Sequence, residues 1–308
     1  MKINTYGNGE SGKLEPFVAN DNLNKPELYF PSEGLKAAVN VSLALGQPLL
    51  LTGEPGTGKT QLAYHVAHFF GLNEPLVFNA QTTSTATDLF YRYDALAHFQ
   101  VSQNAKTDPL SMTAEKRLEM VEPFINFNAL GKAIKEKTRV VVLIDEVDKA
   151  PRDFPNDLLA AIEKLSFKVP ELNNREYTTD PSVRPIIILT SNSEKNLPDA
   201  FLRRVIYFHI DFPEKLDLMR ILIQKTSISQ DKADALVGHF LKVRGMGLKK
   251  KPATAEMLAW AVLLTSMGFP IEKLNGDLSK EKDLLLPLHT SYSVLAKTQE
   301  DLKALKAL

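Results

Sequence analysis

A glycine-rich loop is the feature that most constrains what this chain can fold into. Residues 53–60 read GEPGTGKT and match the pattern G-x-x-x-x-G-K-[ST]. An apolar segment, 48–52, precedes the loop, and a helical pattern over 61–70 follows it. Glycines let the backbone N–H groups converge on phosphate oxygens, and the first turn of the next helix presents its positive dipole end to the same anion. The sequence therefore predicts a strand, a phosphate-binding loop and a helix.

The loop residues are expected to share the binding of a nucleotide and its magnesium ion. Lys59 is expected to reach the β- and γ-phosphates, and Thr60 to offer its hydroxyl to Mg²⁺. The candidate nucleotide-binding residues form one continuous segment: Gly53, Glu54, Pro55, Gly56, Thr57, Gly58, Lys59, Thr60 and Gln61.

Charge and cysteine content exclude several classes of function. Lys plus Arg and Asp plus Glu number 37 each, so no net charge draws the chain to nucleic acid or to an acidic membrane. The chain has no cysteine, which excludes disulfides, thiolate metal sites and cysteine nucleophiles. No apolar run approaches the ~20 residues that cross a bilayer, and the N-terminal segment lacks the apolar core of a signal peptide. We therefore expect a cytoplasmic protein that has no membrane span.

Strand and helix patterns alternate through residue 212 and become purely helical afterwards. Strands are expected at 49–51, 76–79, 140–144, 186–189 and 205–212, with a hairpin at about 166–180 that turns at Asn173-Asn174. Helices are expected at 154–165, 216–223, 233–243, 255–267 and 291–308. This order predicts an α/β fold with a doubly wound parallel sheet, followed by a small α-helical lid. The expected domains are a polar tail or linker at 1–27, a nucleotide-binding domain at 28–212 with an insertion at about 87–127, and the lid at 213–308.

Two acids end the most apolar strand. Asp145 and Glu146 follow the run 140–144, and ligands of open α/β sheets collect at the carboxyl ends of strands. Asp145 is placed to hold Mg²⁺, directly or through water, and Glu146 to orient and polarise a water that attacks the γ-phosphate. The alternative, two exposed acids that cap the next helix, is weakened by the phosphate loop upstream.

Polar and basic residues follow the later strands. Asn192 comes after the strand at 186–189, where a neutral amide can hydrogen-bond the attacking water, although Thr190 and Ser191 can do similar work and a turn-capping asparagine is the ordinary interpretation. Arg203 and Arg204 stand side by side before the last strand, and adjacent arginines need anionic partners. An arginine delivered to the γ-phosphate neutralises charge in the transition state.

These motifs, in this order and spacing, resemble an AAA+ ATPase. The correspondence runs from Walker A at 53–60 and Walker B at 140–148 to Asn192 as sensor 1 and an arginine-finger segment at 197–204. The segment DEVDKAP at 145–151, the hairpin and the arginine-finger segment resemble the MoxR-type branch. The resemblance covers roughly residues 30–265.

The resemblance implies ATP as the nucleotide and a ring, usually a hexamer. In such a ring Arg204 aligns with the finger that completes the neighbouring site, while Arg203 stands where an acid is more usual and can share the role. Asn79 matches a position that holds the catalytic glutamate inactive. The lid has PAT at 252–254 where relatives carry the sensor-2 arginine, so Arg244 or one of Lys249, Lys250 and Lys251 takes its place, or the contact is missing.

The leading hypothesis is a Mg²⁺-dependent ATP hydrolase in which Glu146, Lys59, Asn192, Arg204 and Arg203 carry the chemistry. The resemblance further implies a chaperone-like remodeller or activator of a partner protein, often one with a von Willebrand factor A domain. Two alternatives stay open. One is an ATP-dependent assembly scaffold with little turnover, and the other is a DNA-associated motor, which the neutral charge disfavours.

Overall fold

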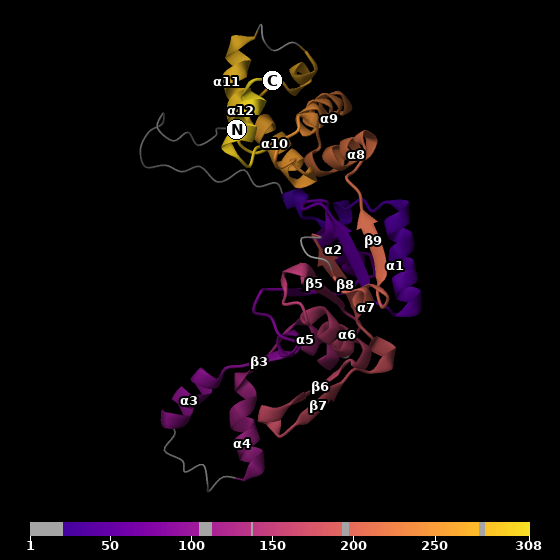
Figure 1. Ribbon diagram of the computed structural model, residues 1–308, viewed down its shortest axis with the longest axis vertical. Coiled ribbons are helices and arrows are strands. Elements are labelled where there is room, and N and C mark those ends of the chain that lie inside the picture. Colours follow the sequence, from indigo (N-terminus) through magenta and orange to yellow (C-terminus); the bar gives the residue numbers. More distant parts are fainter. Residues whose placement is uncertain (1–20, 105–112, 137, 193–196, 277–280) are drawn as a thin grey trace. The chain divides into compact units, whose positions relative to one another are not determined.

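The computed structural model describes residues 21–104, 113–136, 138–192, 197–276 and 281–308 (Figure 1). The chain forms two compact units. The sheet unit comprises Pro31–Gly53 and Leu62–Ile210, and the helical unit comprises Met1–Phe30, Glu54–Gln61 and Asp211–Leu308. The phosphate loop is therefore continuous with the sheet through β1 and α2 but groups with the helical unit by its contacts.

The centre of the sheet unit is a five-stranded parallel sheet in the order β2-β5-β8-β1-β9. Its strands are β1 (Leu49–Gly53), β2 (Leu76–Asn79), β5 (Val141–Asp145), β8 (Ile186–Ser191) and β9 (Ile206–Ile210). Every residue of β1 is buried, as expected for a strand covered on both faces. Because all five strands run in parallel, β1, β5 and β8 end at one edge of the sheet. The expected parallel sheet is confirmed, with β9 ending two residues earlier than the pattern predicts.

Residues 31–210, which contain these strands, also form helices. They are α1 (Glu33–Leu45), α2 (Lys59–Phe69), α3 (Ala95–Asn104), α4 (Ala114–Val121), α5 (Ala129–Lys135), α6 (Phe154–Lys164) and α7 (Asp199–Leu202). Helix α1 begins where the Ser32 hydroxyl accepts from the Leu35 N–H at 3.2 Å and ends at Gly46 in the left-handed conformation. It packs on β9 so closely that a Cβ on Gly34 would lie 3.1 Å from the Phe208 ring.

Two antiparallel ribbons extend the sheet unit. One pairs β3 (Tyr91–Tyr93) with β4 (Ile125–Phe127), and the other is the hairpin of β6 (Ser166–Val169) and β7 (Arg175–Thr178). The hairpin confirms the expected turn, because Asn173 and Asn174 both adopt positive φ, at 57° and 59°. The ribbons meet at Phe167, whose ring stacks on Tyr91 of β3 at 6.1 Å and meets Phe127 of β4 edge-on at 6.2 Å. The expected insertion therefore contains a ribbon that packs on the hairpin, in addition to α3 and α4.

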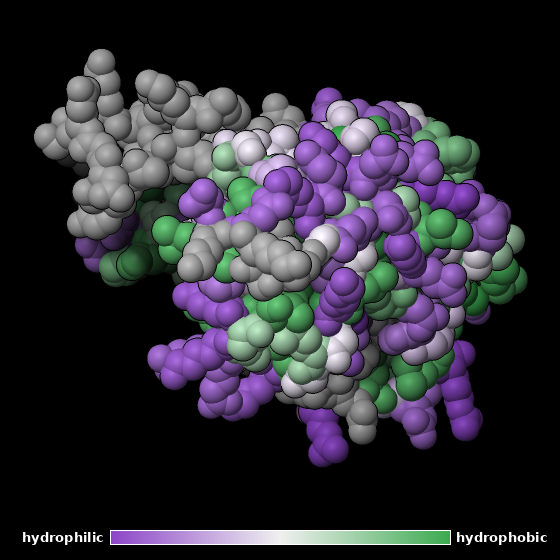
Figure 2. Space-filling model, turned by 90° about the horizontal axis from the view of Figure 1, so that it is seen from above, coloured by the Kyte–Doolittle hydropathy of each residue, from purple (hydrophilic) through white to green (hydrophobic). Residues whose placement is uncertain are grey.

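The helical unit packs its own apolar core. Its helices are α8 (Lys215–Thr226), α9 (Gln230–Gly245), α10 (Thr254–Ser266), α11 (Lys282–Ser291) and α12 (Gln299–Lys306). Trp260, Phe240 and Tyr292 are among its fully buried side chains. The Trp260 indole N–H donates to the Ser291 hydroxyl at 2.8 Å. In the view of Figure 2, hydrophilic residues alternate with small hydrophobic areas, and no continuous apolar area dominates the coloured part of that face.

The prediction of a single helix at 291–308 is wrong. Helix α11 ends at Ser291, and α12 starts only at Gln299. The Thr298 hydroxyl accepts from the Asp301 N–H at 3.1 Å, and this cap starts a new helix where the pattern suggests continuity.

Residues 21–27, expected to belong to a polar tail or linker, contain one short 3-10 turn and most of a second. These are Asp21–Leu23 and Pro26–Leu28. The buried Lys225 of α8 donates its ammonium to the Leu23 carbonyl, and burial lowers the pKa of this lysine from its ordinary value. The remainder of the expected tail, residues 1–20, lies outside the described residues. Within the described part of the chain, no helix combines the length and apolar character needed to traverse a bilayer.

Candidate functional site

The phosphate loop has the backbone that its glycines predict. Gly53, Gly56 and Gly58 have φ values of 147°, 77° and 90°, which residues other than glycine rarely adopt. A Cβ on Gly58 would also lie 3.0 Å from the Tyr29 ring, so the aromatic ring lies directly against the loop. Helix α2 starts at Lys59, which places the N–H groups of its first turn at the end of the loop.

The side chains of the loop converge on one of its own carbonyls. The Glu54 carbonyl accepts from the Lys59 ammonium at 2.9 Å and from the Thr57 hydroxyl at 2.8 Å. Lys59 is buried, with 7% of its surface exposed. A buried ammonium needs hydrogen-bond acceptors, and the loop supplies one from its backbone. Lys59 therefore lies folded into the loop in which it is expected to meet phosphate.

The acids at the end of β5 are joined by a threonine of β8. The Thr190 hydroxyl donates to the Asp145 carboxylate and accepts from the Glu146 N–H at 2.9 Å. Glu146 has φ 56° and ψ 49°, a left-handed conformation that is unfavourable for a residue with a side chain. Thr190 stabilises this turn and fixes the orientation of Asp145. In the sequence Thr190 is one of several polar residues around Asn192, and nothing there singles it out for this role.

Both oxygens of the Glu146 carboxylate have partners. Oε1 accepts from the Asn192 side-chain amide at 2.9 Å, and Oε2 pairs with the Lys149 ammonium at 2.5 Å. The structure thus brings together Asp145, Glu146 and Asn192, as the order of strands in the sheet requires. Lys149 was not anticipated as a partner of Glu146, although their separation by three residues was a usable signal.

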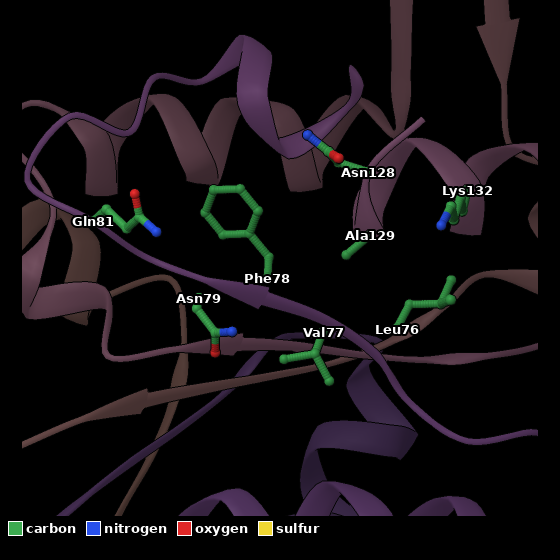
Figure 3. A pocket seen from close by; sticks show the side chains of 8 residues that line it. All are labelled: Leu76, Val77, Phe78, Asn79, Gln81, Asn128, Ala129 and Lys132. Atoms are coloured by element: carbon green, nitrogen blue, oxygen red, sulfur yellow. The ribbon is translucent and has the colours of Figure 1, made fainter. Parts of the chain in front are cut away.

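No hydrogen bond joins Asn79 to Glu146 among the described residues. In the described residues, the carboxylate is bound by Asn192 and Lys149, while Asn79 pairs through its backbone register with Asp145. Its side chain lines a pocket of about 320 Å³ beside β2 and α5. Figure 3 shows Asn79 and Val77 on one side of β2 and Phe78 on the other. The resemblance implies that Asn79 restrains Glu146, and this conformation has no such hydrogen bond.

The two arginines before β9 are exposed. Arg204 lies 3.8 Å from a Glu163 carboxylate oxygen, with more than half of each side chain in solvent. Exposed pairs of this kind contribute little to stability. Arg203 makes no side-chain ion pair or hydrogen bond to another part of the chain that the structure describes. Both guanidinium groups therefore remain accessible to a partner.

One of the four candidate basic residues of the lid contacts the phosphate loop. Arg244, near the end of α9, pairs with the Glu54 carboxylate at 2.7 Å and donates to the Pro252 carbonyl at 2.6 Å. Lys249 instead pairs with Glu300 at 2.6 Å. Lys250 and Lys251 are exposed. The start of α10 also touches the loop, because a Cβ on Gly56 would lie 3.0 Å from that of Ala253.

Thr60 and Asp145, the residues expected to hold magnesium, both carry the oxygen donors that a hard divalent cation prefers. No group of three or more metal-binding side chains occurs among the described residues. A magnesium ion at a nucleotide commonly uses one or two protein ligands, with phosphate and water completing its shell. The Thr60 hydroxyl and the Asp145 carboxylate, which Thr190 orients, are oxygen donors of that class.

Comparisons with known proteins agree with the motif order. A family model described as "AAA domain (dynein-related subfamily)" matches residues 48–205. Gas vesicle ATPase GvpN1 of Halobacterium salinarum is 26% identical over 194 residues, 60% of this chain and 53% of that protein. Gas vesicle ATPase GvpN2 of the same organism is 26% identical over 208 residues, 66% of this chain and 58% of that protein. The match thus spans little more than half the length of these curated relatives.

Solved structures of RuvB from Thermotoga maritima are more distant. One RuvB mutant gives a TM-score of 0.47 with 15% identity and covers 85% of this chain and 73% of that chain. The RuvB Holliday junction branch migration motor gives a TM-score of 0.43 with 16% identity and covers 91% of this chain and 71% of that chain.

Proposed function

Because the chain belongs to the AAA domain family, dynein-related subfamily, we propose that it binds Mg²⁺-ATP and hydrolyses it. The observation that carries this proposal is the carboxylate of Glu146, held at 2.9 Å by the Asn192 amide at the sheet edge from which the phosphate loop departs. A carboxylate and a neutral amide at that edge are suited to align a water for attack on a terminal phosphoryl group.

The loop residues bind the nucleotide in this proposal. Lys59 exchanges the Glu54 carbonyl for phosphate oxygens, and the backbone N–H groups of the loop residues other than Pro55 converge on the same anion. Thr60 and Asp145 hold Mg²⁺, which supplies charge neutralisation to the phosphates. Thr190 keeps Asp145 oriented for this task through its hydrogen bond.

Glu146 acts on the attacking water. Its carboxylate accepts a hydrogen bond from the water and takes up its proton. The water oxygen bonds to the γ-phosphorus as the bond to the bridging oxygen breaks, so that ADP leaves with the electron pair of that bond and the proton passes on to the phosphate. Asn192 orients the carboxylate through Oε1, and Oε2 becomes available when the Lys149 ammonium moves away. This exposed ion pair is weak enough to break without a large cost.

The arginines complete the site of a neighbouring copy in a ring. Their exposure supports this proposal, since a guanidinium that acts on another subunit must be accessible. Arg204 aligns with the finger, and Arg203 shares or exchanges the role. Six subunits are the number that the AAA+ resemblance implies.

The biological output is proposed from the resemblance and from the relatives' names. A MoxR-like protein is expected to remodel or activate a partner in a chaperone-like way, and a partner with a von Willebrand factor A domain is the specific expectation. The matched relatives are named as gas vesicle ATPases, so assembly of a protein structure is the kind of work to test first. A cytoplasmic location remains part of this proposal.

A slowly hydrolysing scaffold is the second candidate. Both oxygens of Glu146 are occupied, and this arrangement favours a state in which the carboxylate does not yet activate water. Phosphate release by concentrated, assembled protein separates the candidates, because sustained turnover is incompatible with a pure scaffold.

The proposal is tested by Glu146→Gln. Turnover is expected to fall by about 100-fold or more, because the amide is a poor acceptor for the water proton, while ATP binding is retained. Phosphate release and equilibrium binding of a fluorescent ATP analogue measure the two effects. Glu74→Gln, an exposed glutamate of the sheet unit, serves as the matched control and should behave like the parent. Parent-level turnover in Glu146→Gln would remove Glu146 from the mechanism.

A further inference from the structure

Glu54 connects the phosphate loop to the helical unit through two chemically different groups. Its backbone carbonyl accepts from Lys59 and Thr57, and its carboxylate pairs with Arg244 of α9. All these residues belong to the helical unit. The residue that holds the phosphate-binding lysine is therefore the same residue that a lid arginine holds.

Arg244 is fixed from three directions. Its guanidinium pairs with Glu54 at 2.7 Å, donates to the Pro252 carbonyl at 2.6 Å and lies 3.5 Å from the centre of the Phe212 ring. Its side chain is 11% exposed, whereas that of Glu54 is 49% exposed. The planar guanidinium can lay its face on a ring while it donates hydrogen bonds within its plane, and the tetrahedral ammonium of lysine has no such flat face. Arg244 is therefore the more shielded partner of the pair, and Glu54 is the more exposed one.

The Arg244–Glu54 pair differs from an ordinary surface ion pair of the same unit. Lys215 and Asp234 also lie 2.7 Å apart, but about half of each side chain is in solvent and neither contacts the loop. Such a pair contributes little. Arg244 is largely shielded from water, so losing its partner leaves a poorly solvated cation and losing the cation leaves an uncompensated carboxylate.

The charge of Glu54 matters most when phosphate is present. A polyphosphate bound by the loop brings several negative charges to the same short loop that carries the Glu54 carboxylate, and like charges on one loop oppose binding. Lys59 must also release the Glu54 carbonyl before it can reach phosphate. A cation that neutralises the carboxylate and fixes the residue lowers both costs.

Building on the ATP site proposed above, we propose that Arg244 is a positioning residue through which the helical unit controls nucleotide affinity. It compensates the charge of Glu54 beside the polyphosphate and links movement of the loop to α9. Arg244 acts on the nucleotide through Glu54 and does not touch the transferred group. Its effect therefore falls on affinity and not on the chemical step.

Arg244→Met tests this role. The dissociation constant of a fluorescent ADP analogue is expected to rise about tenfold, the change that the loss of one charged hydrogen-bonded pair commonly produces. Glu54→Gln alone should weaken binding less than Arg244→Met does, since the amide leaves no charge to compensate. The double variant should return close to Glu54→Gln, because the carboxylate that Arg244 compensates is gone. In turnover assays Arg244→Met should raise KM with kcat within about twofold of the parent.

Lys215→Met is the control, since it removes an ion pair of equal length from the same unit without touching the loop. Its nucleotide affinity should equal that of the parent. If Arg244→Met does not fold, Arg244→Lys replaces it in the same cycle, with a smaller loss in affinity expected because the charge is kept.

The outcomes separate two failures. A parent protein that binds no nucleotide overturns the proposed function. A parent that binds and hydrolyses ATP, with Arg244→Met equally tight or with strictly additive effects in the double variant, overturns only the role of Arg244. A loss confined to kcat would also contradict it, because a residue that acts through Glu54 on binding leaves the chemical step intact.

Discussion

The two units of this protein use polar side chains in opposite ways. In the sheet unit, Asp145, Glu146 and Asn192 lie partly exposed at the ends of parallel strands, where Glu146 is hydrogen-bonded to Asn192 and Asp145 to Thr190. In the helical unit, polar groups such as His239 and Trp260 are buried and join one helix to another. The first arrangement leaves polar atoms available to a ligand, and the second consumes them in the core. Substitutions of these polar residues in the sheet unit should therefore change ATP turnover, and substitutions in the core of the helical unit should change the free energy of unfolding.

The largest expected effect belongs to the core of the helical unit. Trp260→Ala should lower the free energy of unfolding by about 3–5 kcal/mol, because it removes a fully buried indole and leaves a cavity. Urea unfolding followed by circular dichroism measures the loss. Trp260→Phe should recover much of it, and an alanine variant as stable as the parent would contradict the comparison.

A pH effect of intermediate size is expected in the same unit. Burial lowers the pKa of His239 to about 4 from the ordinary value of 6.5. The unfolded chain therefore takes up a proton that the folded unit excludes, so stability present above pH 6.5 is lost as the pH falls toward 4. For this residue the loss is about 3 kcal/mol.

Trp260, the only tryptophan of the chain, lies 5.7 Å from His239 between ring centres, and its fluorescence reports unfolding of this unit. His239→Gln provides the control, since Gln can still hydrogen-bond the Tyr292 hydroxyl but does not titrate. An equal pH dependence in the parent and in His239→Gln would contradict the assignment.

The smallest expected effect tests the sheet edge. Thr190→Val removes the hydroxyl that donates to Asp145 and accepts from the Glu146 N–H, so ATP turnover should fall about tenfold. Thr190→Ser keeps the hydroxyl and should stay near the parent rate. Phosphate release at saturating ATP is the measurement. Unchanged turnover in Thr190→Val would show that the edge tolerates a disordered Asp145.

Patterns along the sequence predicted much of this arrangement because they are local. About ten residues of sequence are enough to recognise each of three segments: the loop at 53–60, the buried strand before Asp145 and the strand before Asn192. Parallel pairing then brings the strand ends to one edge, and so the cluster of Asp145, Glu146 and Asn192 follows from the fold class.

The remaining features depend on contacts that leave no periodic signal. Glu54 and Arg244 are 190 residues apart in the sequence. Nothing in the sequence around either residue indicates that the other is its partner. Residues 292–298 separate α11 from α12, and Thr298 caps the start of α12, within a stretch that the sequence pattern suggested was one helix. The insertion has mixed polarity, so its ribbon could be found only from the packing around Phe167. Domain boundaries at residues 27 and 212 stay predictions.

The stacked rings around Phe167 also have a mechanical consequence. Phe167 in the hairpin stacks on Phe90 at 4.8 Å, and Phe127 of β4 meets Tyr177 of β7 edge-on at 5.4 Å. Neither ribbon can tilt without separating these rings. A force applied to the tip of either ribbon is therefore transmitted to both, and the pair behaves as one stiff arm.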